Sequence, residues 1–227
     1  MPANDRRYDI YALIHKGLRA YLSHVLLEVG RTDWSCAANR GSSLQSVREL
    51  LEVCEAHLLQ KHDRILPAME ARRPGASKEA QLSYQEHRHA INQLQDVAAT
   101  VEAANHYNRE SAGEWLYREL ALFVADNLEL MATEERYNNR VLWDTHSDAE
   151  IIEIEQQMLA AMPAERMLPL VRWTVPNLAP DERALMLGEM LREGASAEVF
   201  DCVLAMLRAL LPPKEWGRLT LALSTRY

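Results

Sequence analysis

Apolar side chains recur with a period of about 3.6 residues along four long stretches, at roughly 8–29, 44–71, 77–104 and 111–143. That spacing places them on one face of an α-helix, whereas a strand would need strict alternation. Leu, Ala, Glu, Arg and Gln, all good helix formers, dominate the chain, and runs of β-branched residues are missing. The sequence therefore predicts an all-α protein built around four long helices that each bury one face.

Helix-breaking residues indicate where the long helices end. Gly30 follows the first stretch, and the polar segment 33–43 is expected to be a connection. Pro67 should kink or shorten the last turn of the second stretch, because proline lacks the amide donor of a helical hydrogen bond. Pro74-Gly75 then ends that stretch.

The sequence changes character after residue 146. Ser147 with Glu150 three residues later is typical of a capping box at a helix start. Prolines and a glycine then separate short apolar stretches, at Pro163, Pro169, Pro176, Pro180, Gly194 and Pro212-Pro213. We therefore expect two parts, a long-helix domain at 1–146 and a small helical C-terminal region of four or five short helices at 147–227.

Composition excludes several classes of protein. The formal net charge is −8 and no basic stripe is present, so nucleic-acid binding is not expected. No apolar run approaches the ~18 residues of a membrane span, and the N-terminus lacks the apolar core of a signal peptide. Cys36, Cys54 and Cys202 are scattered and odd in number, which disfavours a disulfide framework or a zinc ribbon. These features indicate a protein of the reducing cytoplasm.

Helical geometry sorts the eight histidines. His15, His57 and His87 each share a helix face with apolar residues and are expected to point inward. Tyr11 and Tyr84 are expected in the core on the same faces. The other five histidines fall on other faces or near helix ends and are expected at the surface: His24, His62, His89, His106 and His146.

Glu134 lies in the apolar stripe of the fourth stretch. A carboxylate there is costly unless it is paired or bound to a cation. Three inward histidines and one inward glutamate, one from each helix, match the arrangement of metal sites in the cores of four-helix bundles. Imidazole with carboxylate suits iron, manganese or zinc. For each histidine alone, a hydrogen-bonded core histidine is the alternative interpretation.

At these residues the sequence resembles the hemerythrin-like, or HHE cation-binding, family. The resemblance rests on His15 in IHKGLR, His57 in AHLLQKHDRILPAME, His87 in QEHRHAI and Glu134 in FVADNLELMATEERYNNRVLW. The stretches ILPAMEARRPGAS and LAPDERALMLGEML also resemble a bacterial branch with a helical C-terminal extension. The resemblance implies an up-down four-helix bundle that binds non-heme iron, mononuclear or dinuclear, and with it O₂ or NO binding, sensing or iron handling.

Three further ligand positions of that family are altered here, to Lys61, Ile91 and Leu130. A dinuclear centre needs bridging carboxylates, and Lys61 places a cation where one would lie. Our hypothesis is that Lys61 replaces the charge of a metal and pairs with Glu134. The resemblance then leaves His15, His57 and His87 with Glu134 as metal ligands.

A second hypothesis is a chain without any cofactor. It would be a metal-free helical scaffold that acts through protein–protein contact, as a homodimer through its C-terminal helices. Enzymatic activity is not expected, since no Gly-rich phosphate loop, GxSxG or HExxH motif is present. A Cys54–His57 nucleophile pair is disfavoured because a buried thiol is usually inert.

Overall fold

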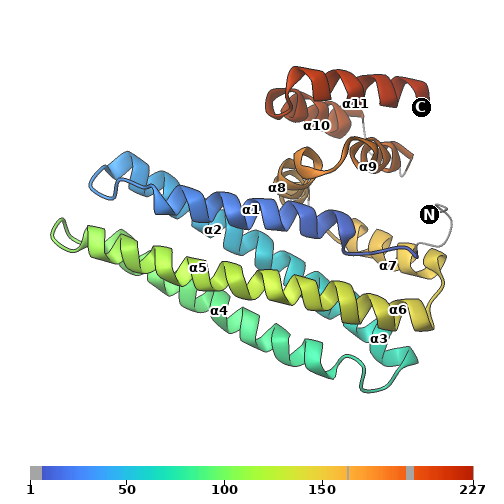
Figure 1. The fold of residues 1–227 in the computed structure, drawn as a ribbon, viewed down its shortest axis with the longest axis horizontal. Coiled ribbons are helices and arrows are strands. Elements are labelled where there is room, and N and C mark those ends of the chain that lie inside the picture. Colours follow the sequence, from blue (N-terminus) through green and yellow to red (C-terminus); the bar gives the residue numbers. More distant parts are fainter. Residues whose placement is uncertain (1–6, 163, 193–196, 227) are drawn as a thin grey trace. The chain divides into compact units, whose positions relative to one another are not determined.

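A computed structural model describes residues 7–162, 164–192 and 197–226, and these are helical almost throughout (Figure 1). No strand occurs among these described residues, which confirms the all-α prediction. The helices are α1 (Ala12–Gly30), α2 (Ala37–Gln60), α3 (Leu66–Arg72), α4 (Lys78–Ala103), α5 (Arg109–Thr133), α6 (Asn139–Thr145), α7 (Asp148–Ala160), α8 (Ala164–Thr174), α9 (Pro180–Arg192), α10 (Ala197–Leu210) and α11 (Pro213–Arg226). None of these helices is long and apolar enough to cross a membrane.

Three short turns of other helix types join these segments. The π-helical turn η1 (Lys61–Ile65) continues α2 into α3, and the π-helical turn η2 (Glu134–Asn138) continues α5 into α6. A 3₁₀ turn, η3 (Val175–Asn177), follows α8. The second and fourth stretches of the sequence are therefore each one long helix with a π turn in it.

The chain divides into two compact units. The first unit comprises the residues before Leu13 together with Tyr21–Ala161. The second comprises Leu13–Ala20, a stretch of α1, and the residues from Met162 onward. The boundary expected after His146 coincides with the end of α6, while the first unit continues through α7.

In the first unit the long helices lie alongside one another (Figure 1). Helix α4 packs against both α2 and α5. Their apolar faces form a core with almost no exposure, to which α2 contributes Val47, Leu50 and Leu51, α4 contributes Ile91, Leu94 and Val101, and α5 contributes Leu116, Leu120 and Phe123. A second cluster joins Tyr11 to the α3, α6 and α7 segments through Ile65, Met69, Leu142 and Ile151.

The second unit has its own apolar core. Helices α8 to α11 contribute Val171, Leu187, Val203, Leu207 and Leu219 to it. The Arg183 guanidinium is buried beneath this core and donates to the carbonyl oxygens of Val175, Pro176 and Leu178 and to Glu215. The three carbonyl oxygens lie in and just after η3 and Glu215 lies in the first turn of α11, so this arginine joins the two segments and has a structural role.

The polar segment 33–43 was wrongly expected to be a connection, because α2 begins at Ala37. The Asp33 carboxylate accepts hydrogen bonds from the amides of Ser35 and Cys36, which forms a tight turn just before the helix. Ser43 is buried and its hydroxyl meets that of Thr32 at 2.7 Å. Only the first few residues of this polar segment, those before Ala37, therefore form a turn.

Pro67 was expected to kink or shorten the second helix, and the irregularity lies just before it. Pro67 occupies the first turn of α3, directly after η1. Its missing amide is tolerated there, since the helical ladder is already altered by the π turn. The helix continues to Arg72.

The capping box predicted at Ser147 is confirmed. The Ser147 hydroxyl accepts from the Glu150 amide, and the Glu150 carboxylate accepts from the Ser147 amide at 2.8 Å. Arg72 also donates to Glu150, at 2.5 Å. The hydrogen bond from Arg72, followed by those from Ser147, lowers the pKa of Glu150 from 4.5 to about 2.

Glu150→Gln is expected to flatten the acid side of the stability profile. A carboxylate with a lowered folded pKa stabilises the fold above its unfolded pKa and loses that contribution as pH falls through the folded value. Wild type should therefore exceed the variant in stability above about pH 4.5, and the difference should vanish near pH 2. Urea unfolding at stepped pH measures it, with Glu153→Gln on the exposed side of α7 as control. If the free energy of unfolding of wild type and that of Glu150→Gln changed equally with pH, this linkage would be contradicted.

Candidate metal centre

Three of the four predicted ligands lie together in the interior. His15 on α1, His57 in the last turn of α2 and Glu134 at the start of η2 offer ligand atoms that are all within 4.8 Å of one another. Their residue exposures are 0%, 9% and 6%. Helix α1 is continuous through His15 and also carries the buried core residues Leu18 and Leu22.

Lys61 forms an ion pair with Glu134 at this place. The Lys61 Nζ donates to Glu134 Oε1 at 2.5 Å, and the two side chains are only 6% and 7% exposed. The pairing of these two residues, a hypothesis drawn from the altered family ligand position of Lys61, is confirmed. A charge-assisted bond of this length in a dry interior is strong, although burying both charges is itself costly.

Both residues of the ion pair open a π-helical turn. Lys61 is the first residue of η1, and Glu134 is the first residue of η2. A π turn inserts one residue into the helical ladder, and such turns occur frequently at functional sites. The buried Lys61–Glu134 ion pair therefore lies where the two π turns interrupt the long helices.

The Tyr11 hydroxyl and the Asn138 side-chain amide extend the polar cluster. Asn138, the last residue of η2, donates to the Tyr11 hydroxyl at 3.1 Å, and both side chains are buried. Burial, followed by the negative charge of Glu134, raises the pKa of Tyr11 well above its usual value. Tyr11 is therefore a neutral phenol at any physiological pH, and its hydroxyl can still donate a proton to a hydrogen bond.

Cys54 lies one turn before His57 on the same buried face of α2. Burial raises the pKa of the Cys54 thiol to about 12, and the Lys61 charge offsets this only in part. A thiol with so high a pKa is not a nucleophile near neutral pH. The structure therefore gives no support to a Cys54–His57 catalytic pair.

His87 is not part of the cluster. It is half-buried, and its Nδ1 lies 2.9 Å from the Ser83 carbonyl oxygen one turn earlier in α4, to which it donates. In a neutral ring, that bond selects the tautomer in which Nε2 carries no proton. Nε2 is buried without a hydrogen-bond partner among the described residues. Of the altered positions, Ile91 is buried and Leu130 half-buried, and both are apolar.

Four of the five histidines expected at the surface are at least partly exposed. His24, His89 and His106 are exposed, and His62 stacks on the Tyr84 ring with 4.2 Å between ring centroids. The prediction was wrong for His146, which is 9% exposed. His146 follows the end of α6, where helical spacing no longer sets direction, and burial lowers its pKa.

The donor set suits one metal ion and not two. Two imidazole nitrogens and a carboxylate are ligands that iron, manganese and zinc accept. A dinuclear centre would require further carboxylates to bridge the ions. The residue beside Glu134 is Lys61, a cation, and Ile91 and Leu130 supply no ligand atom. A two-metal centre therefore does not fit these residues.

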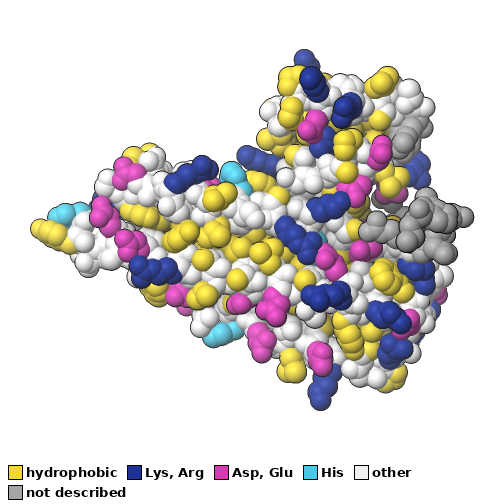
Figure 2. All heavy atoms as spheres, viewed as in Figure 1, with side chains coloured by type: hydrophobic (Ala, Val, Ile, Leu, Met, Phe, Trp, Pro, Cys, Tyr) yellow, Lys and Arg dark blue, Asp and Glu magenta, His cyan; other side chains and the backbone are white. Residues whose placement is uncertain are grey.

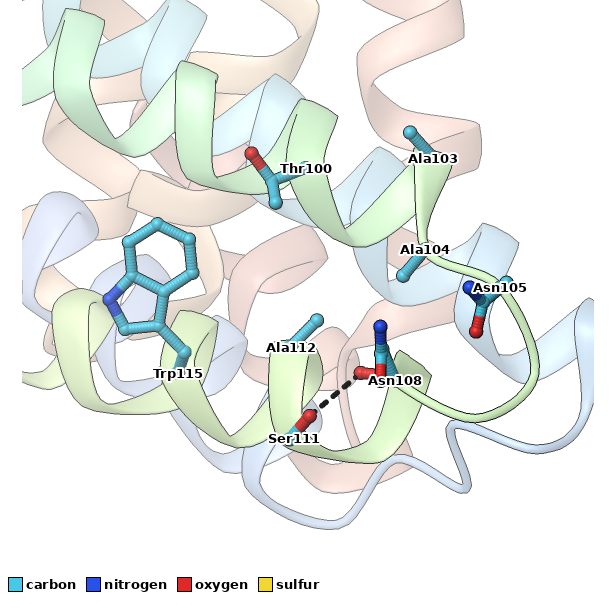
Figure 3. A pocket seen from close by; sticks show the side chains of 8 residues that line it. All are labelled: Thr100, Ala103, Ala104, Asn105, Asn108, Ser111, Ala112 and Trp115. Carbon is cyan, nitrogen blue, oxygen red and sulfur yellow. Dashed lines mark hydrogen bonds between the residues drawn. The ribbon is translucent and has the colours of Figure 1, made fainter.

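A surface groove at the far end of α4 and α5 does not compete with this site. It is an open hollow of about 620 Å³ lined by small and polar side chains and by Trp115 (Figure 3). The lining includes Thr100, Asn105, Asn108 and Ser111, and the Ser111 hydroxyl donates to the Asn108 carbonyl oxygen. No histidine, cysteine or carboxylate lines it, so it lacks both metal ligands and acid–base groups.

The sequence interpretation missed part of this site. Asn138 was not expected to take part in it, and Tyr11 was expected only in the core. Their polar contact depends on how η2 turns the helix, for which the sequence carries no known signal.

Comparisons with models of known protein families, with curated proteins and with solved structures find no match to this chain.

Proposed function

We propose that this chain is a hemerythrin-like protein that binds one divalent transition-metal ion, iron first, through His15, His57 and Glu134. The observation that carries the proposal is the approach of these three buried ligand atoms to within 4.8 Å of one another. Two imidazoles and one carboxylate are the ligand set of many mononuclear non-heme iron sites. An ion held by three protein ligands keeps positions for a small ligand such as O₂ or NO.

The proposed fold is an up-down four-helix bundle of α1, α2, α4 and α5, each with its continuation. The long side-by-side helices and the resemblance of the sequence around His15, His57, His87 and Glu134 support it. In such a bundle the core ligands come from different helices. His15, His57 and Glu134 follow that rule, since they come from α1, α2 and the α5–η2 helix.

Lys61 is the residue that sets this chain apart in the proposal. Its ammonium neutralises Glu134 when no metal is bound. A metal ion that binds Glu134 must displace that ammonium, so Lys61 lowers the metal affinity. The protein would thus hold iron less tightly than a site whose seven family ligands are complete, which suits exchange or sensing better than permanent storage.

Cobalt(II) titration under anaerobic conditions tests the proposal. Co²⁺ occupies sites of this donor type, and its visible absorption reports imidazole and carboxylate coordination. We expect one Co²⁺ per chain for wild type, and loss of binding in His15→Gln and in His57→Gln. His24→Gln is the matched control, because His24 lies on the exposed side of the same helix as His15. Unchanged binding in both site variants would contradict the assignment.

A second candidate function is favoured by the ion pair itself. With Lys61 at 2.5 Å from Glu134, the charge of the carboxylate is already balanced without a metal. The chain would then be a metal-free helical scaffold that acts through protein contacts. Absence of Co²⁺ binding in wild type and in the His24→Gln control would favour this second function.

A further inference from the structure

The outward side of α5 carries a regular row of exposed residues. Ser111, Trp115, Arg118, Leu122, Ala125 and Glu129 are all exposed, and we call them the α5 stripe. They follow one another at intervals of four, three, four, three and four residues, which is the spacing of a coiled-coil seam. The opposite side of α5 is buried, so the stripe faces away from the core. Trp115 is 42% exposed and Leu122 is 62% exposed.

Four residues of the α5 stripe, Arg118, Leu122, Ala125 and Glu129, are complementary to themselves in the antiparallel direction. If a second α5 is laid against the first with an axis between Phe123 and Val124, Arg118 faces Glu129 of the other copy. Leu122 then faces Ala125, a large residue against a small one, as close helix packing requires. In the parallel direction Arg118 would face its own copy, and like charges in register are unfavourable. The charge order along the stripe therefore selects an antiparallel pair.

The residues that border the stripe define how the two helices would meet. Tyr117 and Leu128, 42% and 37% exposed, lie on one side of it. Glu119 and Asp126 lie on the other side. The second helix is therefore expected to cover Tyr117 and Leu128 and to leave Glu119 and Asp126 in water. Figure 2 shows hydrophobic side chains running along this face between charged ones.

Arg118 is available for such a contact. Its present partner is Glu114, one turn earlier, at 3.3 Å, with side-chain exposures of 73% and 67%. An exposed pair of this kind contributes little and is easily exchanged. Binding a second copy would exchange it for a less hydrated pair with Glu129.

We propose that the α5 stripe is a dimer interface that binds the α5 stripe of a second copy of this chain, antiparallel and across a twofold axis. In a twofold interface each contact occurs twice, so both Arg118–Glu129 pairs form together. The inference is independent of metal binding, because no stripe residue belongs to the metal centre.

Exchanging charges in the full chain tests three points together. These are whether the partner is a second copy, whether the two helices are antiparallel, and whether Arg118 faces Glu129. Sedimentation velocity over a concentration series should give a dimer for wild type. Arg118→Glu and Glu129→Arg should each weaken dimerisation by about 10-fold or more, because both pairs become repulsive. A 1:1 mixture of the two variants should form the dimer again, as should the double variant, because opposite charges then face one another. Lys78→Glu, exposed at the start of α4, is the control and should dimerise as wild type does.

Three results would overturn the proposal. The first is a wild-type chain that stays monomeric at the highest concentration of the series. The second is a dimer that neither Arg118→Glu nor Glu129→Arg weakens, which would place the interface elsewhere. The third is a mixture of the two variants that remains monomeric. Circular dichroism confirms folding of each variant, and folding is expected to be unchanged because both positions are exposed.

Discussion

Lys61→Ala is expected to lower the free energy of unfolding of the metal-free protein by about 3–5 kcal/mol. The substitution leaves the Glu134 carboxylate charged, desolvated and without its ammonium partner in a site where its side chain is 7% exposed. It also removes three methylene groups, Cγ to Cε, from the interior. Thermal unfolding followed by circular dichroism measures the change, which corresponds to a fall in melting temperature of roughly 6–20 °C for a chain of this length. Lys78→Ala, an exposed lysine on α4, should be near neutral.

A double-substitution cycle separates the ion pair from ordinary core packing. Glu134→Leu alone should also destabilise strongly, since it leaves the Lys61 ammonium buried. The double variant Lys61→Met with Glu134→Leu should cost far less than the sum of Lys61→Met alone and Glu134→Leu alone, because an apolar pair of similar volume leaves no unpaired charge. Additive losses would mean that Lys61 and Glu134 act independently and that the pair does not stabilise the fold.

Lys61→Met is expected to raise the affinity for a divalent metal ion by about 100-fold or more. Two unit charges 4 Å apart interact by about 4 kcal/mol at an effective dielectric constant of 20, and each 1.4 kcal/mol is a tenfold change in affinity. Methionine keeps the length of the side chain while it removes both the repulsive ammonium and the competitor for Glu134. The metal-free variant is destabilised, so added metal should also raise its melting temperature more than that of wild type.

Competition with a chelator of known affinity measures this gain, using Co²⁺ or Zn²⁺ as the ion. Lys61→Arg is the matched control, because it keeps the positive charge and should bind metal no more tightly than wild type. Lys61→Met in a His57→Gln background should lose the gain. Equal affinities for wild type and Lys61→Met would show that Lys61 and the metal do not compete for Glu134.

The helices could be predicted from helical spacing, and the ion pair from that spacing together with the altered family ligand position at Lys61. Lys61 falls four residues after His57 and seven after Cys54, so it shares their inward face. Glu134 falls three residues after Met131 on the inward face of α5. Two opposite charges on the interiors of packed helices have few other partners, which made their pairing predictable.

The exact membership of the cluster could not be predicted, because it depends on height and rotation along the helices. His87 points inward by its spacing, yet its Nδ1 bonds to Ser83 and the ring stays outside the group of three. The π turns η1 and η2 rotate the helical segments α3 and α6 that continue from them, and no residue pattern announces these turns. His146 lies beyond a helix end, where its burial is set by tertiary contacts that sequence spacing does not describe.

The most direct test of the central claim is the metal content of the full chain, purified without chelators or an affinity tag and measured by elemental mass spectrometry after anaerobic iron loading. We expect about one iron per Lys61→Met chain, less in wild type at the same free iron concentration, and none in His57→Gln. That order would mean that His15, His57 and Glu134 hold a single ion against the charge of Lys61. No stoichiometric metal in any of the three, Lys61→Met included, would contradict the account and would leave the buried ion pair as a structural element of a metal-free scaffold.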